Sequence, residues 1–385
     1  MITKLIHRTM LLAAICLGCI SCSDETSLQQ SVPEGNGQVK IQYKIAGPSL
    51  SRATEPGWSR DWHENLITRI DLFVFTSKGE YHDHIEASAA EGESLSDTDE
   101  DRYTPLETDA LTYEDVSESD YIYYMVANCP QLADLQNITL TQLKVEMIET
   151  AIVLDKKQDV FVMDGEGVCT NSEDGQTITL SFNLARAAVK IRLAVFDANG
   201  TSIIGDCKFR LHNYVLTGTS VLEASEMYGK KMGQSLVAES EKLDWNDILK
   251  YNSQAVFYSY PNDWFDENLL AENGTFIEDD TYAKDDLIDE TRQTYIMVDY
   301  KNNAYKVPVN FSIANDNDRT FSNDEEEIAY IKEIRDKYYR IKRNYIYDIK
   351  ATIDVETGEI QIEHKILVNA WNEKGEMDII FGGEE

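Results

Sequence analysis

The residues with the clearest spacing for chemistry are two histidines, His82 and His84, which flank Asp83. Residues two apart in an extended strand lie on the same face, so these two imidazoles could hold a metal ion together. A metal site needs further ligands, and among the 6 histidines of the chain no third ligand is obvious. We therefore favour an exposed, polar strand end and expect no metal ion.

An acidic stretch before residue 328 offers the oxygen ligands that calcium prefers. Asp316, Asp318 and Asn323 precede four consecutive acids at 324–327. The glycine and the full ligand spacing of an EF-hand are missing, so a solvated acidic loop is the favoured interpretation.

The motifs of the common enzyme classes are absent from the sequence. It contains no GxSxG elbow, phosphate-binding loop, dinucleotide glycine fingerprint or HExxH helix. Carboxylate pairs are too numerous to indicate acid–base catalysis. The sequence therefore predicts a protein that is not an enzyme and that has no cofactor.

Composition narrows the class of protein further. The 385 residues carry 69 Asp and Glu against 35 Lys and Arg, a formal charge of −34. Phosphate backbones are bound by clustered cations, so this excess of negative charge excludes nucleic acid as a partner. Hydrophobic residues make up 42% of the chain, enough for packed cores. The 21 tyrosines favour half-buried strands, and the length indicates two domains.

The amino terminus has the pattern of a bacterial lipoprotein signal peptide, which we predict over residues 1–21. Lys4 and Arg8 precede an apolar run from Met10 to Ile20. That run is too short to span a bilayer as a helix, which is typical of a cleaved signal.

A cysteine at the end of this run is the expected site of lipidation. Cys22 follows a small residue, as in a lipobox, and Cys19 is a weaker alternative. The CxxCxxC spacing that includes Cys16 is not interpreted as a metal site, because Cys16 and Cys19 lie inside the apolar run. Acyl chains on Cys22 would tether the mature protein to a membrane from outside, and residues 22–37 would form a flexible leash.

Three further cysteines, Cys129, Cys169 and Cys207, are widely spaced and odd in number. A disulfide framework is therefore not expected. Buried free thiols are favoured, and one disulfide among the three stays open.

Alternating apolar residues predict strands along most of the chain. Apolar residues recurring at three and four predict two short helices, at 140–150 and 324–338. The predicted strands are 39–45, 121–126, 160–163, 177–182, 208–215, 255–260, 295–300, 305–313, 344–353, 360–368 and 377–381.

A repeated pattern supports two domains. Ile70, Leu72, Val74, Phe75 and Gly79 recur in the same order 121 residues later, from 70 to 191, as Ile191, Leu193, Val195, Phe196 and Gly200. Each copy describes a strand that ends in a turn glycine. We place the boundary just before the second copy and predict domains at 38–184 and 185–385.

Several short motifs, taken in order, resemble the fimbrillins, the FimA-type fimbrial subunits of Bacteroides-like bacteria. The resemblance covers most of the chain, and it is carried by the order of the motifs because none is specific alone. It implies an all-β fold with minor helices, in which two tandem transthyretin-like β-sandwich domains follow a lipoprotein signal peptide. Besides the lipobox and the strand at 39–45, the motifs are 51–54, 70–75, 123–128, 162–165, 184–191, 343–347 and Trp371 with Gly375.

The resemblance also implies processing by a trypsin-like protease, which in fimbrillins cuts after an arginine just beyond the first strand. Arg52-Ala53 lies seven residues after Ile45, among glycine, proline and serine residues typical of an accessible loop. Arg60 and Arg69 are the competing sites, and Arg69 lies within a strand pattern.

The resemblance further implies that removal of the first strand leaves an apolar groove, which a strand of another subunit fills. Val39, Ile41, Tyr43 and Ile45 alternate with polar residues and would face inward. An exposed sheet edge beside such a groove recruits strands.

The carboxy-terminal tail is the expected donor of the replacing strand. Two groups of residues each share one face of an extended chain, and a permanent hairpin within the second domain is the alternative. The donor residues are Ile366, Val368, Met377, Ile379 and Phe381.

These expectations describe a structural pilus subunit on the surface of the outer membrane, with other pilus subunits and the processing protease as partners. The alternatives are an anchor or tip component of the same family, a surface lipoprotein that binds glycans, and a metal-dependent hydrolase. Glycan binding would use exposed aromatic residues, for which Trp58, Trp62, Trp245 and Trp264 are the candidates. The sequence does not distinguish stalk, tip and anchor roles.

Overall fold

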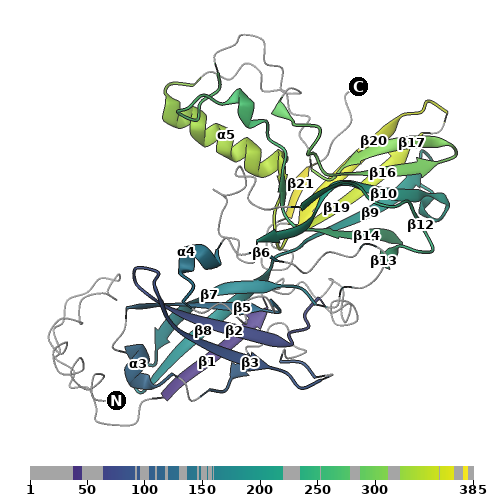
Figure 1. Ribbon diagram of the computed structural model, residues 1–385. Coiled ribbons are helices and arrows are strands. Elements are labelled where there is room, and N and C mark those ends of the chain that lie inside the picture. Colours follow the sequence, from purple (N-terminus) through teal and green to yellow (C-terminus); the bar gives the residue numbers. More distant parts are fainter. Residues whose placement is uncertain are drawn as a thin grey trace.

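The computed structural model shows a protein built mainly from β-strands, with a few short helices and one longer one (Figure 1). This confirms the all-β prediction. The structure describes residues 38–45, 64–91, 93–95, 104–108, 111–117, 120–129, 137–144, 147–148, 154, 158, 160–219, 235–251, 253–277, 287–310, 321–354, 356–367 and 376–379.

Seven strands form the first lobe, a sheet in the order β3-β2-β5-β7-β8-β1-β4. Strand β8 shows why the sheet forms, because Ile178, Leu180, Phe182 and Leu184 alternate with more exposed residues and are buried. The bounds are β1 (Gln38–Ile45), β2 (Arg69–Thr76), β3 (Tyr81–Ser88), β4 (Thr104–Leu106), β5 (Tyr121–Ala127), β7 (Met163–Asn171) and β8 (Thr177–Arg186).

The prediction of a strand at 160–163 was wrong in extent. The observed strand, β7, begins at Met163 and continues to Asn171. Its glycines explain the difference, since they break the apolar alternation but let β8 approach closely. A Cβ on Gly165 would lie 2.4 Å from the backbone oxygen of Asn183. Only glycine fits that approach.

Two further sheets form the second lobe and enclose one core between them. One has the order β11-β10-β16-β17, with β12 and β6 paired to β10; the other has the order β13-β14-β9-β19-β20-β21. The bounds are β6 (Met147–Ile148), β9 (Val189–Asp197), β10 (Lys208–Thr219), β11 (Ser235–Glu239), β12 (Leu243–Asp244), β13 (Leu249–Tyr251), β14 (Gln254–Ser259), β16 (Tyr295–Tyr300), β17 (Asn303–Pro308), β19 (Ile346–Ile353), β20 (Ile360–Leu367) and β21 (Glu376–Ile379).

The helices are short except for one. Helix α5 (Asp324–Tyr338) has the predicted bounds, and Asn323 caps it by accepting a hydrogen bond from the Glu326 amide. The bounds of the others are α3 (Tyr113–Ser117), α4 (Leu140–Leu143), η2 (Ile204–Asp206) and η3 (Glu267–Leu269); strands β15 (Asn262–Asp263) and β18 (Arg340–Ile341) form a separate pair. None of the helices in the described part of the chain is long and apolar enough to cross a membrane.

The predicted helix at 140–150 was wrong in its second half. A capping box between Thr139 and Gln142 starts α4, which ends at Leu143. Met147 and Ile148 instead form β6 and pair with the far end of β10, at Thr219 and Gly218. A long-range pairing therefore overrides the local helical pattern.

The two copies of the sequence repeat become β2 and β9, and Gly79 and Gly200 both have positive φ, of 77° and 78°. Their places in the sheets differ. β2 lies between two antiparallel neighbours, whereas β9 lies between antiparallel β14 and parallel β19. The strand of the first lobe that matches β9 is β1, because each runs parallel to a long strand from later in its lobe, β8 or β19.

Candidate assembly site

Strand β1, the predicted displaced strand, lies between β8 and β4. It runs parallel to β8 in an unbroken register, from Gln38 opposite Thr177 to Ile45 opposite Leu184. β4 pairs only with residues 41–43, and among the described strands it has no other partner. Without β1, the edge of β8 would lose its partner and β4 would lose its place in the sheet.

Three side chains of β1 enter the core of the first lobe. Ile41, Tyr43 and Ile45 are 3%, 2% and 5% exposed, whereas Val39 is half-buried at the edge of the cluster. Lys40, between them, is exposed. The strand therefore fills a groove with one of its faces.

Polar contacts fix the register of β1. The Gln42 Nε2 donates to the Ser181 Oγ at 2.9 Å, and the Tyr43 hydroxyl donates to the Leu95 backbone oxygen. Burial raises the pKa of Tyr43 to about 12, so the phenol stays protonated and keeps donating.

The chain that follows β1 is described again from Glu64, which lies buried where the two lobes meet. Its carboxylate accepts from the Tyr258 hydroxyl and lies 3.1 Å from the Lys190 Nζ. Its backbone oxygen accepts from the Arg186 Nε at 2.9 Å. All four residues are 2% exposed or less. Glu64 thus connects the start of the first lobe to β8, β9 and β14.

A second ionic group extends the same junction. Arg343 pairs with Asp164 and also donates to the backbone oxygens of Ala185 and Arg186. The other Asp164 oxygen accepts from the Tyr124 hydroxyl at 2.6 Å. Together with the Glu64 contacts, these bonds hold the two lobes against each other at the β8–β9 connection.

Sequence reasoning missed this junction, although a signal was present. Arg186 and Lys190 interrupt an otherwise apolar run at 184–191. Cations buried in such a run need a carboxylate, which directs attention to distant acids. Nothing in the sequence singles out Glu64 among 69 acidic residues.

The tail residues lie at the far edge of the second lobe. β20 pairs with β19, and β21 pairs with β20, placing Met377 opposite Ile366 and Ile379 opposite His364. This is the arrangement of the intramolecular hairpin that the sequence left open. Donation of the tail stays a prediction, and Val368 and Phe381 lie outside the described residues.

Several predicted residues cannot be placed. Cys22, Arg52 and Ala53 lie outside the described residues, as do the competing Arg60 and the candidate glycan residues Trp58 and Trp62.

The competing site Arg69 is described, in β2. There it donates to Asp71, at 2.7 and 2.8 Å, and also pairs with Glu86. Both partners hold the guanidinium within the sheet.

The two histidines that could hold a metal ion each contact a different set of residues. The His84 Nε2 lies 2.9 Å from the Asp71 Oδ1, and its ring stacks on Phe73. His82 stacks on Tyr121 at 4.3 Å between ring centroids. Within the described residues, no three His, Cys, Asp or Glu side chains gather where they could hold a metal ion.

The remaining candidates have structural contacts. Trp264 is fully buried and Trp245 is half-buried beside Phe209, so neither is an exposed platform. Asp316 and Asp318 lie outside the described residues, and Asn323 caps α5. No disulfide joins the three described cysteines, of which Cys129 and Cys207 are buried and Cys169 is exposed.

Comparison with known proteins found no matching family model. Curated relatives named the major fimbrium tip subunit FimD, from Porphyromonas gingivalis, are 24% identical over 331 residues, which cover 83% of this chain. The chain spans 41% of the length of these relatives. This similarity confirms the resemblance to fimbrillin-type fimbrial proteins.

Solved structures with similar chains have related descriptions. The tip fimbrial protein Mfa3 from P. gingivalis is 12% identical, with a TM-score of 0.46, over 85% of this chain and 98% of its own. A fimbrilin, FimA, from P. gingivalis is 13% identical, with a TM-score of 0.44, over 90% and 99%. A fimbrial assembly protein from Parabacteroides distasonis is 11% identical, with a TM-score of 0.46, over 85% and 94%.

Proposed function

We propose that this protein is a structural subunit of a surface pilus that supports adhesion. It is exported as a lipoprotein through Cys22, cut after Arg52 by a trypsin-like protease, and polymerised when a strand of another subunit replaces β1. The observation that carries the proposal is the place of β1, which is paired along its whole length yet precedes the proposed cut.

The energetics of β1 explain why its loss would drive assembly. Three fully buried side chains contribute about 1.5–3 kcal/mol each, or about 5–9 kcal/mol together. Removing them would expose an apolar groove beside the open edge of β8. A replacing strand of similar area would restore this contribution, so the polymer would persist mainly through slow dissociation.

The edge position of the tail supports its role as donor. Among the described strands, β21 is the last of its sheet and pairs only with β20. It has four residues, so few backbone hydrogen bonds hold it. A short edge strand with one neighbour is the least costly strand to detach.

The test is to treat precursor lacking residues 1–21 with a trypsin-like protease and to run the product on a denaturing gel without boiling. We expect ladders of stable polymers. Arg52→Ala should abolish them, and the matched variant Arg60→Ala should not. Deletion of residues 366–385 should leave processed monomers.

Two results would contradict the proposal at different points. Ladders from Arg52→Ala would place the cut elsewhere. Ladders from the tail deletion would mean that another segment donates the strand.

A tip subunit is the second candidate, favoured by the name of the curated relatives and by the folded-back tail. Such a subunit would be cut and would accept a donor strand, but its own tail would stay in β20 and β21. The processed protein would then form no ladders alone and would form one defined complex with a subunit whose tail donates.

A further inference from the structure

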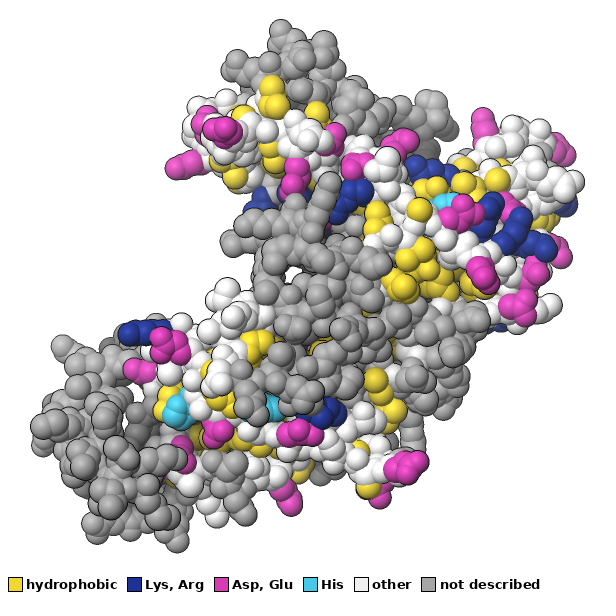
Figure 2. All heavy atoms as spheres, viewed as in Figure 1, with side chains coloured by type: hydrophobic (Ala, Val, Ile, Leu, Met, Phe, Trp, Pro, Cys, Tyr) yellow, Lys and Arg dark blue, Asp and Glu magenta, His cyan; other side chains and the backbone are white. Residues whose placement is uncertain are grey.

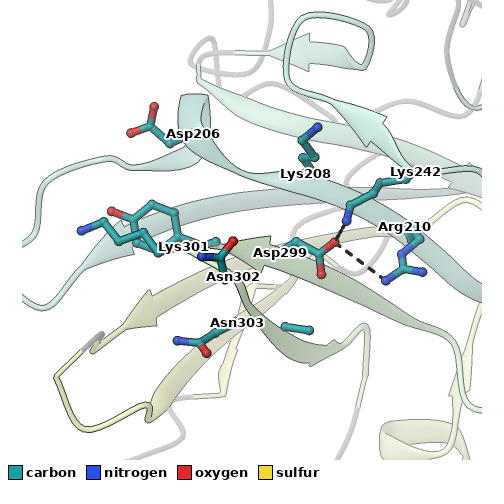
Figure 3. Close-up of a pocket in the computed structure, with 10 residues that line it drawn as sticks. Asp206, Lys208, Arg210, Lys242, Asp299, Lys301, Asn302 and Asn303 are labelled. Carbon is teal, nitrogen blue, oxygen red and sulfur yellow. Dashed lines mark ion pairs between the residues drawn. The ribbon is translucent and has the colours of Figure 1, made fainter.

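A hollow of about 430 Å³ opens on the second lobe, remote from β1 and lined by none of its residues. Figure 3 shows that β10 supplies Lys208 and Arg210, that Asp299 lies near the end of β16, and that Lys301 lies in the following turn. Lys242 reaches the same place from the segment before β12.

Positive charge gathers at this hollow in a chain whose formal charge is −34. Lys208, Arg210, Lys242 and Lys301 line it, against the carboxylates of Asp206 and Asp299. Figure 2 shows Lys and Arg side chains clustered on the second lobe, whereas acidic side chains are scattered over the visible surface. Asp244 and Glu239 pair with Lys208 and Arg210 beside the hollow, so an anion meets balanced charges here, whereas most of the surface would repel it.

The ion pairs of these cations leave room for a ligand. The side chains of Lys208 and Lys242 are 51% and 45% exposed, and they pair with Asp244 and Asp299. The Arg210 NH1 pairs with Glu239, whose side chain is 48% exposed, whereas its NH2 is 3.8 Å from Asp299, beyond hydrogen-bond length. Exposed pairs of this kind contribute little, so a ligand carboxylate can share the ammonium and guanidinium donors.

The turn at the rim has an unusual backbone. Lys301 and Asn302 have φ of 47° and 67°, as in the two-residue turn that joins β16 and β17. Such turns favour Asn and Gly at these positions. A lysine adopts this backbone conformation at a cost in free energy. Its Nζ lies 5.1 Å from the centroid of the Tyr300 ring, and the side chains of Asn302 and Asn303 also line the hollow.

We propose that this hollow binds an acidic sugar residue, of the uronic acid class, at the end of a glycan. The lysines and Arg210 hold the sugar carboxylate. The side-chain amides of Asn302 and Asn303 donate hydrogen bonds to its hydroxyls and accept from them, and the two Asp carboxylates accept from them. The same two carboxylates disfavour sulfate or phosphate, which carry more charge and have few or no hydroxyl donors.

The test measures binding to the unprocessed chain lacking residues 1–21, so it does not depend on pilus assembly. The probes, followed by ligand-observed NMR and titration calorimetry, are D-glucuronic acid, D-glucose and sodium sulfate. Glucuronic acid should bind at least tenfold more tightly than either other probe, and added salt should weaken its binding.

Variants locate the site. Lys242→Gln with Lys301→Gln should weaken glucuronic acid binding at least tenfold, and Asn302→Gly, which keeps the turn, should weaken it severalfold. Lys332→Gln, an exposed position on α5, is the matched control and should change nothing. Equal binding of glucose, sulfate binding as tight as that of glucuronic acid, no binding of any probe, or unaltered binding by Asn302→Gly would each overturn the proposal.

Discussion

Glu64 and Lys190 bury opposite charges at the centre of the junction between the lobes. A buried pair of this kind returns little net stability, because desolvation offsets the attraction between the charges. Its value lies in specificity, since the carboxylate is satisfied only when Lys190 of β9 and Tyr258 of β14 are both in place. The contact therefore selects one arrangement of the lobes.

Lys190→Met should destabilise the protein by about 3–5 kcal/mol, because it leaves the Glu64 carboxylate buried without its cation. Urea unfolding measures this. The matched control is Lys208→Met, whose pair with Asp244 is half exposed and should contribute far less to stability. Equal effects of the two substitutions would show that burial does not decide the cost.

Tyr43→Phe should destabilise the protein by about 1 kcal/mol at pH 7, through the lost hydrogen bond to Leu95. The folded pKa of Tyr43, about 12, lies above its ordinary value of 10.0. The folded state thus holds a proton that the unfolded state releases, so this stability is complete below pH 10 and is lost between pH 10 and 12. The difference between wild type and variant, followed by urea unfolding, should shrink over that window; a constant difference would contradict the shift.

At the scale of elements, each of the two lobes contains a pair of parallel strands. An early strand of each runs parallel to a long strand from later in the lobe, as β1 does beside β8 and β9 beside β19. β9 is held on its other side by β14, which has six residues, whereas β1 has only the three-residue β4. The strand proposed to leave is therefore the less enclosed of the two.

Individual strands could be read from the sequence because their alternation is local. Tyr121–Ala127 and Tyr295–Tyr300 lie within one residue of their predicted bounds, as does α5. The repeat at 70 and 191 correctly predicted two strands with turn glycines, but it could not predict their neighbours, since a strand's pattern reports which faces are buried. Glu64 was missed for a related reason: its partners lie more than 100 residues away in the chain.

At the scale of the whole molecule, the proposed exchange requires that β1 be replaceable without unfolding the rest. A synthetic peptide of residues 38–45, added during processing, should suppress ladders because it refills the groove beside β8. The same peptide with Ile41→Asp should not, since a buried carboxylate has no partner there. Denaturing gels without boiling measure both, and suppression by both peptides alike would argue against groove binding.

The direction in which β1 runs has a consequence for filament shape. Its amino end lies opposite Thr177 and its carboxyl end opposite Leu184, close to the β8–β9 connection. A carboxy-terminal segment of another molecule that runs in the same direction as β1 would enter the groove from the outer end of the first lobe. Its later residues would lie nearer the β8–β9 connection. The molecule that donates this segment would then lie beyond that outer end. Repetition of this step would give an open, polar chain of molecules arranged head to tail.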